Sequence, residues 1–199
     1  MSKSQIQAVS GKATVTRTDG TTDSITLGTP IFQGDIIETE GEGAVNIVFV
    51  DETSLAVSQN AKLAIDEYVF DPASESGTTD VSVLRGLFVF TSGLIGRDDP
   101  DDVNIDTPMG SIGIRGTVIV GNADTGEITV MEGAIVLRSF NGSEITLAQQ
   151  FDTGRFEPAT GDVTYIGKLD SGNFLQNFDS LKPVSPNLFS GLNDGTQDN

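Results

Sequence analysis

The sequence predicts an all-β fold, either a β-solenoid-like arrangement or a β-sandwich, with a short helix near the C-terminal end. Most of residues 11–167 consist of short runs rich in Val, Ile, Thr and Phe, and clusters of Gly, Asp, Asn and Pro separate these runs. The chain has 23 glycines in 199 residues, above the usual share of about 7%, as a fold with many turns requires. Before residue 170 no segment repeats its apolar residues every 3.6 positions, so helices are not expected there.

The predicted strands have the alternating pattern of a sheet with one buried face. In the run that contains Leu63 and Ile65, these two residues fall on one side, and Asp66, Tyr68 and Phe70 fall on the other. The strands are expected at residues 12–18, 44–50, 61–70, 81–85, 87–90, 112–120, 127–131 and 134–139.

A weak internal repeat links two distant segments. Residues 11–20 and 133–142 each begin and end with glycine, and Ile-Thr-Leu follows both, at 25–27 and at 145–147. A strand-turn-strand unit used at both ends of the domain would produce this pattern and would suit a solenoid-like or pseudo-symmetric fold. Chance similarity between two β-hairpins explains it equally well, and the sequence leaves both explanations open.

The chain changes character after residue 168. Phe174, Phe178 and Leu181 recur at helical spacing before Pro183, which predicts a short amphipathic helix able to dock on the sheet. The polar residues that follow have the composition of a linker or a frayed terminus. We therefore expect residues 1–168 to form an all-β domain, and residues 169–199 to form a short helix and a flexible tail.

The composition excludes most familiar enzyme chemistry, because the chain has no histidine and no cysteine. Serine–histidine and cysteine–histidine catalysis, disulfides and iron–sulfur ligation are ruled out, and zinc would have only carboxylates as ligands. We expect a protein that is not an enzyme and that carries no cofactor.

The charge balance limits the partners. The chain has 29 acidic and 11 basic residues and a formal net charge of −18, so phosphate backbones and anionic lipid surfaces would repel it. Nucleic acid is not an expected partner. Membrane insertion is not expected either, because the longest mostly apolar window, residues 112–120, is far shorter than the ~20 residues of a spanning helix. The first residues lack the apolar run of a signal peptide, which leaves a cytoplasmic location open.

Residues 104–117 are the most informative stretch, because they place Arg115 among three glycines in an otherwise apolar run. Other motifs accompany this stretch in a fixed order along the chain. They are Gly34-Asp-Ile36 with Thr39, the run 44–50 with Asp51 and Leu55, Leu63-Ala-Ile-Asp-Glu-Tyr68, Leu84-Arg-Gly-Leu-Phe88, Thr107-Pro-Met-Gly110, Ile114-Arg-Gly-Thr117 and Glu132-Gly133.

This ordered set resembles the FecR domain, an all-β module of bacterial envelope and exported proteins, over about residues 8–165. One departure stands at Asp51-Glu-Thr-Ser-Leu55, where the family usually shows an Asp-Gly-Ser turn. We expect a turn of different geometry there.

The resemblance implies a cellular location and a function. The name-giving FecR proteins are single-pass inner-membrane regulators, with a periplasmic β-region that senses an outer-membrane transporter and a cytosolic helical segment that controls a sigma factor. This chain lacks that helical segment and the spanning helix. Stand-alone FecR-like domains also resemble the opening modules of very large exported repeat proteins, where their role is structural or anchoring.

The expected function is therefore that of a non-catalytic protein-interaction or scaffolding module of the bacterial envelope or of an exported protein. The expected location is periplasmic or extracellular, and the expected partner is an envelope protein or the adjoining domains of a larger chain. Two alternatives remain open: an envelope signal-sensing domain of the FecR regulatory type, and a carbohydrate-binding or carbohydrate-cleaving β-protein.

Arg115 is the first candidate site residue, with Gly116 and Thr117 beside it. We expect its guanidinium to be an internal tie that joins two strands by bonding to a buried carboxylate. Asp35 and Asp66 are the expected partners, because each lies in an apolar β-context where an unpaired charge is costly. In the alternative interpretation, the guanidinium binds an anionic ligand or a carboxylate of a partner.

A run of acidic residues at 97–102 is a weak candidate for a calcium site, because Ca²⁺ prefers oxygen ligands. Its spacing does not match the calcium loop of EF-hands, and an exposed acidic turn is the simpler interpretation. The four carboxylates are those of Asp98, Asp99, Asp101 and Asp102.

Carboxylate pairs such as Asp66 and Glu67 bear on the enzyme alternative, because cleavage of a glycosidic bond needs two acids that face one sugar linkage. Neighbouring residues of a strand point to opposite faces of the sheet. These two side chains are therefore not expected to act together.

Overall fold

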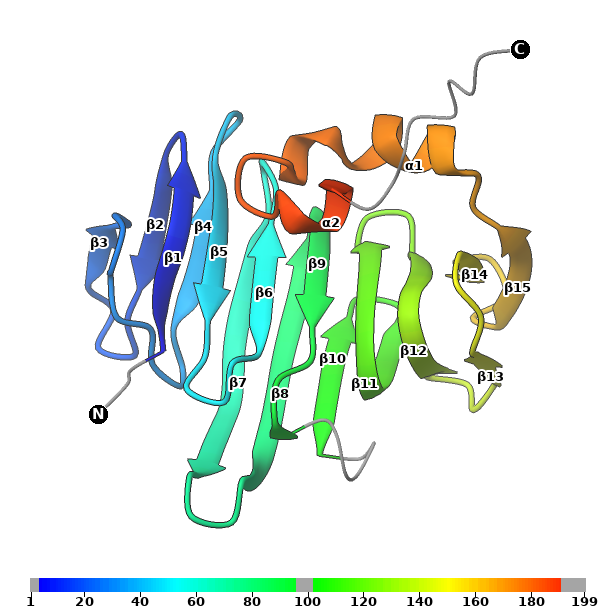
Figure 1. The fold of residues 1–199 in the computed structure, drawn as a ribbon, viewed down its shortest axis with the longest axis horizontal. Helices are drawn as coiled ribbons and strands as arrows, with labels where there is room; N and C mark the ends of the chain where they lie inside the picture. The colour runs from blue at the N-terminus through cyan, green and yellow to red at the C-terminus, as the bar shows by residue number, and fades with distance from the viewer. Residues whose placement is uncertain (1–3, 96–101, 191–199) are drawn as a thin grey trace.

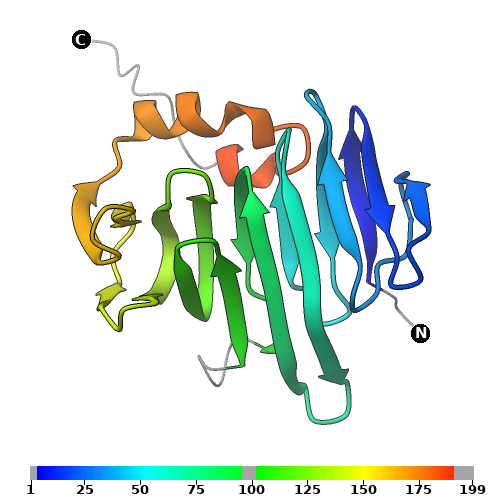
Figure 2. The ribbon, with the colours of Figure 1, turned by 180° about the vertical axis from the view of Figure 1, so that it is seen from behind.

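The computed structural model describes residues 4–95 and 102–190, and it contains one continuous sheet that curls until its two halves face each other (Figures 1 and 2). The all-β prediction and the short C-terminal helix are confirmed. The elements are β1 Gln5–Ser10, β2 Ala13–Thr16, β3 Thr22–Ser24, β4 Ile36–Thr39, β5 Ala44–Val48, β6 Ser54–Val57, β7 Lys62–Asp71, β8 Ser76–Arg85, β9 Leu87–Thr91, β10 Val103–Thr107, β11 Gly110–Asn122, β12 Glu127–Ser139, β13 Glu144–Leu147, β14 Asp152–Phe156, β15 Val163–Lys168, α1 Ser171–Phe178, the 3₁₀ turn η2 Asp179–Leu181 and α2 Asn187–Ser190.

The two halves of the sheet form a front layer and a back layer. In the front layer the strands run in the order β1-β5-β6-β9 and continue into the second half of β11, the first half of β12, β14 and β15. In the back layer the order is β3-β2-β4-β7-β8-β10, followed by the first half of β11, the second half of β12 and β13. The long strands β11 and β12 belong to both layers and join them.

The main core fills the space between the layers, because alternate residues of each strand point inward. Phe88 and Phe90 of β9 and Ile112 and Ile114 of β11 are fully buried in this one cluster. Burial of one such side chain contributes about 1.5–3 kcal/mol. The core fixes the register of each front strand, and it thereby decides which side chains face outward on the front layer.

β11 and β12 pass from one layer to the other at a corner built from two glycines. Two residues of β11, Gly116 and Thr117, stand opposite the single Gly133 of β12, and Gly116 and Gly133 have φ values of 54° and 81°. Such a β-bulge bends a strand, and its left-handed backbone favours glycine. The Ile-Arg-Gly-Thr and Glu-Gly motifs therefore mark the place where the sheet folds over, which we call the glycine corner.

Gly133→Ala is expected to destabilise the protein by about 1–2 kcal/mol more than Gly142→Ala does. A Cβ atom at Gly133 would lie 2.4 Å from the carbonyl oxygen of Gly116, whereas a Cβ at Gly142 would have no heavy atom within 4 Å. Both glycines have positive φ, so each variant also loses about 1–2 kcal/mol through left-handed strain. Urea unfolding of the two variants measures the difference, and equal losses would contradict the close approach at the corner.

Two hairpins of the back layer correspond to the internal repeat. The β2–β3 and β12–β13 hairpins place their turn glycines, Gly20 and Gly142, in the same register. In each turn the side-chain oxygen of the preceding residue, Asp19 or Asn141, accepts a hydrogen bond from the backbone N–H two residues later. The matching geometry favours a true structural repeat over chance similarity.

The C-terminal segment, residues 170–190, forms a strap along the upper edge of the front layer in Figure 1. Asp170 caps α1, because its carboxylate accepts hydrogen bonds from the backbone N–H groups of Gly172 and Asn173. Phe174, Phe178 and Leu181 are buried on the sheet, as their spacing predicted. Within the described residues, no helix has the length and apolar character needed to cross a membrane.

A candidate interaction groove on the front layer

An open groove of about 520 Å³ lies on the front layer beside the strap. A smaller pocket of about 270 Å³ extends it toward the glycine corner, because Thr91, Val118 and Glu132 line both hollows. We call the two together the front groove. Its lining consists of Gln7, Asn46, Val48, Glu52, Ser54, Val89, Thr91, Ser92, Gly93, Gly116, Thr117, Val118, Met131, Glu132, Gln150, Val184, Ser185, Pro186, Asn187 and Leu188.

The alternation of the front strands sets the floor of the groove. In β9, Phe88 and Phe90 point into the core, so Val89 and Thr91 point outward and line the groove. In β12, Val130 points inward while Met131 points outward. The floor is therefore mixed: its apolar part consists of Val48, Val89, Val118 and Met131, and its polar part consists of Gln7, Asn46, Ser54 and Thr91.

The strap supplies one wall of the groove and shares its floor. Val184 and Leu188 line the groove from the strap side. Val89 and Met131 belong to the same apolar cluster as the buried Phe174 of α1, and they also line the groove. The front groove is thus the open continuation of the surface that the strap already covers.

Glu52 reaches the groove from the turn between β5 and β6. Its φ is 71°, a left-handed conformation for which glycine is best suited. The turn therefore has a backbone conformation that glycine adopts easily. The difference from the usual Asp-Gly-Ser turn lies in the side chain of Glu52.

Beside Glu52, the fully buried Asp51 fixes this turn. Its carboxylate accepts hydrogen bonds from the hydroxyl groups of Thr53 at 2.7 Å and Tyr68 at 3.0 Å. Burial and the adjacent Asp51 carboxylate raise the pKa of the Tyr68 hydroxyl above its ordinary value. Tyr68 therefore keeps its proton at neutral pH and continues to donate it to Asp51.

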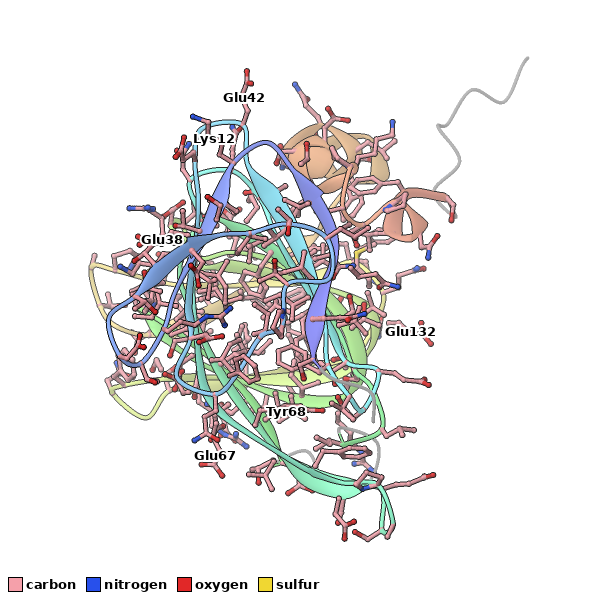
Figure 3. All side chains as sticks on the ribbon, turned by 90° about the vertical axis from the view of Figure 1, so that its left-hand side faces the viewer. Lys12, Glu38, Glu42, Glu67, Tyr68 and Glu132 are labelled. Carbon is pink, nitrogen blue, oxygen red and sulfur yellow. The ribbon has the colours of Figure 1, made fainter. Side chains whose placement is uncertain are left out.

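The front groove is acidic. Glu52 and Glu132 are exposed, and neither side chain has a hydrogen-bond or ion-pair partner among the described residues. No lysine or arginine is found among the lining residues that the structure describes. Figure 3 shows Glu132 on the opposite side of the molecule from Glu38 and Glu67. The groove would therefore attract cationic groups.

Arg115 is exposed at the glycine corner, so the predicted internal tie is wrong. Ile112 and Ile114 are buried, so the alternation of β11 directs the Arg115 side chain to the opposite, outer side, just before the bulge at Gly116. Within the described chain, Arg115 makes no hydrogen bond or ion pair. Gly116 and Thr117, in contrast, line the front groove.

A buried arginine–aspartate tie exists elsewhere in the fold. Arg17 Nη1 donates hydrogen bonds to the Asp35 carboxylate and, at 3.0 Å, to the Pro30 carbonyl. Asp35 is 2% exposed and also accepts a hydrogen bond from the backbone N–H of Phe32. Asp35 is thus buried and paired, but its partner is Arg17 and not the predicted Arg115, because β2 and β4 are neighbours in the back layer.

Asp66 is exposed, which contradicts the prediction that it pairs with a buried arginine. The register of β7 shifts between Ile65 and Glu67, so Asp66 is the extra residue of a β-bulge. Its carboxylate accepts a hydrogen bond from Ser82 Oγ at 2.6 Å. The bulge also shifts the alternation by one residue, so that Tyr68 packs against the core on the same side as Ile65 and not opposite to it.

Asp66 and Glu67 are both exposed, and the bulge at Asp66 interrupts the alternation on which the prediction for this pair rested. Burial raises the pKa of the nearby Asp80 carboxyl, and repulsion from Glu67, Asp106 and Asp66 raises it further. These three carboxylates therefore lie close enough to Asp80 to disfavour its ionised form.

Arg115→Ala is expected to change the free energy of unfolding by less than about 0.5 kcal/mol, as an exposed substitution without a partner does. Arg17→Ala is the matched control, because the same change there leaves the buried Asp35 unpaired and should be far more destabilising. Urea unfolding compares the two variants. A large loss for Arg115→Ala would restore the internal-tie interpretation.

Most of the acidic run considered for calcium lies outside the described residues, namely Asp98, Asp99 and Asp101. Asp102 is described, and its carbonyl accepts a hydrogen bond from the backbone N–H of Thr79 at the start of β10. In the part of the chain that the structure describes, no three acidic side chains are grouped to hold a metal ion. The calcium site stays a prediction.

Sequence reasoning did not single out the two carboxylates of the groove. Glu132 stands directly before Gly133 in a motif that was noted, and Glu52 occupies the turn noted for its departure from the usual pattern. Both signals were therefore present. The sequence could not show that the two positions line one groove, because Glu52 lies in the β5–β6 turn and Glu132 lies on β12.

The family model described as FecR protein matches residues 35–136, half of the chain. The chain belongs to the FecR family. The matched span begins at Asp35, crosses the glycine corner and ends in β12, so it includes most of the groove floor. The strap lies outside the matched span of the FecR domain. No curated protein matches the chain.

Solved structures show the same fold. Two crystal structures of a candidate anti-sigma factor from Parabacteroides distasonis superpose on this FecR protein with a TM-score of 0.53 and 13% identity. Each alignment covers 67% of this chain and 59% of the other, so the chain spans less than two thirds of that protein. A cell surface anchoring domain is 32% identical over 31% of this chain and 82% of its own length, with a TM-score of 0.30.

Proposed function

We propose that this FecR protein is a non-catalytic protein-interaction module of the bacterial envelope or of an exported protein, and that it docks its partner in the front groove. The observation that carries the proposal is the groove itself, in which the outward-facing, half-buried Val48 and Val118 lie among polar and charged residues. Protein interfaces combine an apolar centre with a polar rim in this way. Arg115, Gly116 and Thr117 at the glycine corner would form one end of the docking surface.

The properties of Arg115 fit a role in docking. An exposed guanidinium that has no partner within the described chain can bind a carboxylate of another protein in a bidentate manner. Arginine is also enriched at interface residues that contribute most to affinity. The bulge beside Arg115 holds its backbone in a fixed place, so little order has to be gained on binding.

Residue chemistry supports a binding module over an enzyme. With no histidine and no cysteine in the chain, the most common general base and the strongest nucleophile are missing. The two groove carboxylates lie on an open surface. Activity on a panel of polysaccharides, lost on replacement of one carboxylate, would contradict this part of the proposal and favour a carbohydrate-cleaving protein.

Signal sensing is the second candidate function, because the fold is shared with a candidate anti-sigma factor. In that case the docked partner would carry the signal across the envelope. The scaffolding and sensing versions share the same docking surface, and they differ in whether partner occupancy changes with growth conditions.

Site-specific photo-crosslinking tests the docking surface. We would place p-benzoylphenylalanine at Gln7 or Gln150, which are exposed groove residues, and at Glu67 on the back layer as the control. Irradiation of the native cells should give a discrete crosslinked partner from the groove positions and none from Glu67. No crosslink from the groove, or the same products from Glu67, would contradict the proposal.

A further inference from the structure

We propose that the front groove binds a basic amphipathic segment of the protein partner, with apolar side chains on the groove floor and lysine or arginine side chains on Glu52 and Glu132. The inference rests on the proposed function and adds the chemistry of the bound segment.

The surface that the strap covers continues into the groove, and this indicates that part of the bound segment is apolar. Val89 and Met131 pack in one cluster with Phe174 of the strap and are only 3% and 7% exposed, so they lie at the covered margin of the groove. The half-buried Val48 and Val118 continue the apolar surface into the open part of the floor. Val118 also packs against this cluster and lines the groove. The chain's own amphipathic helix therefore demonstrates what this surface accepts, which is a segment that presents apolar side chains to the front layer.

The negative charge of the groove indicates that the other part of the bound segment is basic. Glu52 and Glu132 come from different parts of the front layer, the β5–β6 turn and β12, and both line the groove. Among the described residues, neither carboxylate has a cationic partner. A segment with acidic side chains would be repelled here, whereas lysine or arginine would meet two carboxylates that are already exposed.

A metal ion is a poorer occupant than a basic segment. Two carboxylates alone make a weak site for a hard cation, which takes six or more oxygen ligands, and the described residues contain no group of three acidic ligands. An ion would also leave the apolar part of the floor uncovered. A basic amphipathic segment satisfies both the floor and the carboxylates.

The backbone at Glu52 provides a sharp test. Glu52 and Glu75 are both exposed and both have positive φ, at 71° and 54°, but only Glu52 lines the groove. Glycine relieves left-handed strain at either site. Glu52→Gly and Glu75→Gly should therefore both keep or raise Tm, and only Glu52→Gly should weaken binding of a basic segment.

The experiment uses a displayed library of random dodecapeptides, selected against the full chain at physiological salt. Enriched peptides should combine lysine or arginine with apolar residues. Binding of one such synthetic peptide should weaken about fivefold or more in Glu52→Gln/Glu132→Gln, because each exposed charge pair contributes modestly. The charge-matched control Glu42→Gln/Glu75→Gln, which removes two exposed carboxylates outside the groove, should change binding less than twofold.

Enrichment of acidic or purely apolar peptides, or equal weakening in both double variants, would overturn the inference. The partner segment crosslinked from Gln7 or Gln150 gives an independent check by mass spectrometry. A crosslinked segment without lysine or arginine would overturn the inference and leave the docking function standing, whereas a lack of any groove crosslink would contradict the docking function itself.

Discussion

Asp35→Ala is expected to lower the free energy of unfolding by about 3–5 kcal/mol, the usual cost of breaking a buried ion pair by removing one partner. Asp35 is 2% exposed and the Arg17 side chain is 18% exposed, so the guanidinium would keep its charge in a site with little water. The backbone N–H of Phe32 would lose its acceptor as well. The loss therefore combines an unpaired charge with an unsatisfied donor.

Asp23→Ala is the matched control for this prediction. Asp23 lies 4.0 Å from Nε of the same Arg17, but its side chain is 67% exposed. The same substitution there should change the free energy of unfolding by less than about 1 kcal/mol. Urea unfolding followed by circular dichroism compares the two variants. Similar small losses in both would show that the Arg17–Asp35 pair does not hold β2 and the loop before β4 in place.

The buried Arg17–Asp35 ion pair shows which part of a contact can be predicted from the sequence and which part cannot. An aspartate in an apolar β-context required a cation, so the pairing of Asp35 with an arginine was predictable from desolvation alone. Which arginine was not predictable, because that depends on strand order. Arg17 directly follows β2, and Asp35 directly precedes β4, which pairs with β2, whereas Arg115 stands at a corner between layers.

The strand pattern was predictable wherever alternation is regular and failed where a bulge interrupts it. The buried face of β7 was correct at Leu63 and Ile65 and wrong after Asp66, where Tyr68 and Phe70 pack on the core, since one extra residue inverts the alternation. Arg115 was misplaced for a different reason, because the apolar run around it was taken as a sign of burial, although alternation from Ile112 and Ile114 places it on the outer side. A bulge leaves no clear trace in apolar periodicity, although glycine beside a charged residue at Arg115-Gly116 is a usable signal.

The front groove could not be predicted from the sequence, for a different reason. Its floor comes from alternate residues of several strands, and its wall comes from the strap. The amphipathic helix of the strap was predictable from Phe174 and Phe178, but the layer it covers is set by where the chain leaves β15. Only the folded chain shows that the strap covers part of an apolar track and leaves the rest open.

Phe174→Ala is expected to lower the free energy of unfolding by about 3–5 kcal/mol, as truncation of a fully buried phenylalanine does. Phe174 is fully buried, and its ring lies 5.2–6.5 Å from the rings of Phe178, Phe189 and Phe151. Phe151 belongs to the segment before β14, so this one side chain joins the strap to the sheet. Urea unfolding measures the loss.

Phe140→Ala is the control for the strap, because the same atoms are removed from a side chain that is 77% exposed, and it should cost less than about 0.5 kcal/mol. Hydrogen exchange then separates two ways in which the strap can be attached. If Phe174→Ala lowers the stability of the whole sheet, the strap and the front layer unfold together, and the groove wall is as permanent as its floor. If exchange rises only in residues 170–190 while the sheet keeps its stability, the prediction is wrong. The strap would then be an element that can leave the sheet separately, and its departure would expose Val89 and Met131 to a partner's segment.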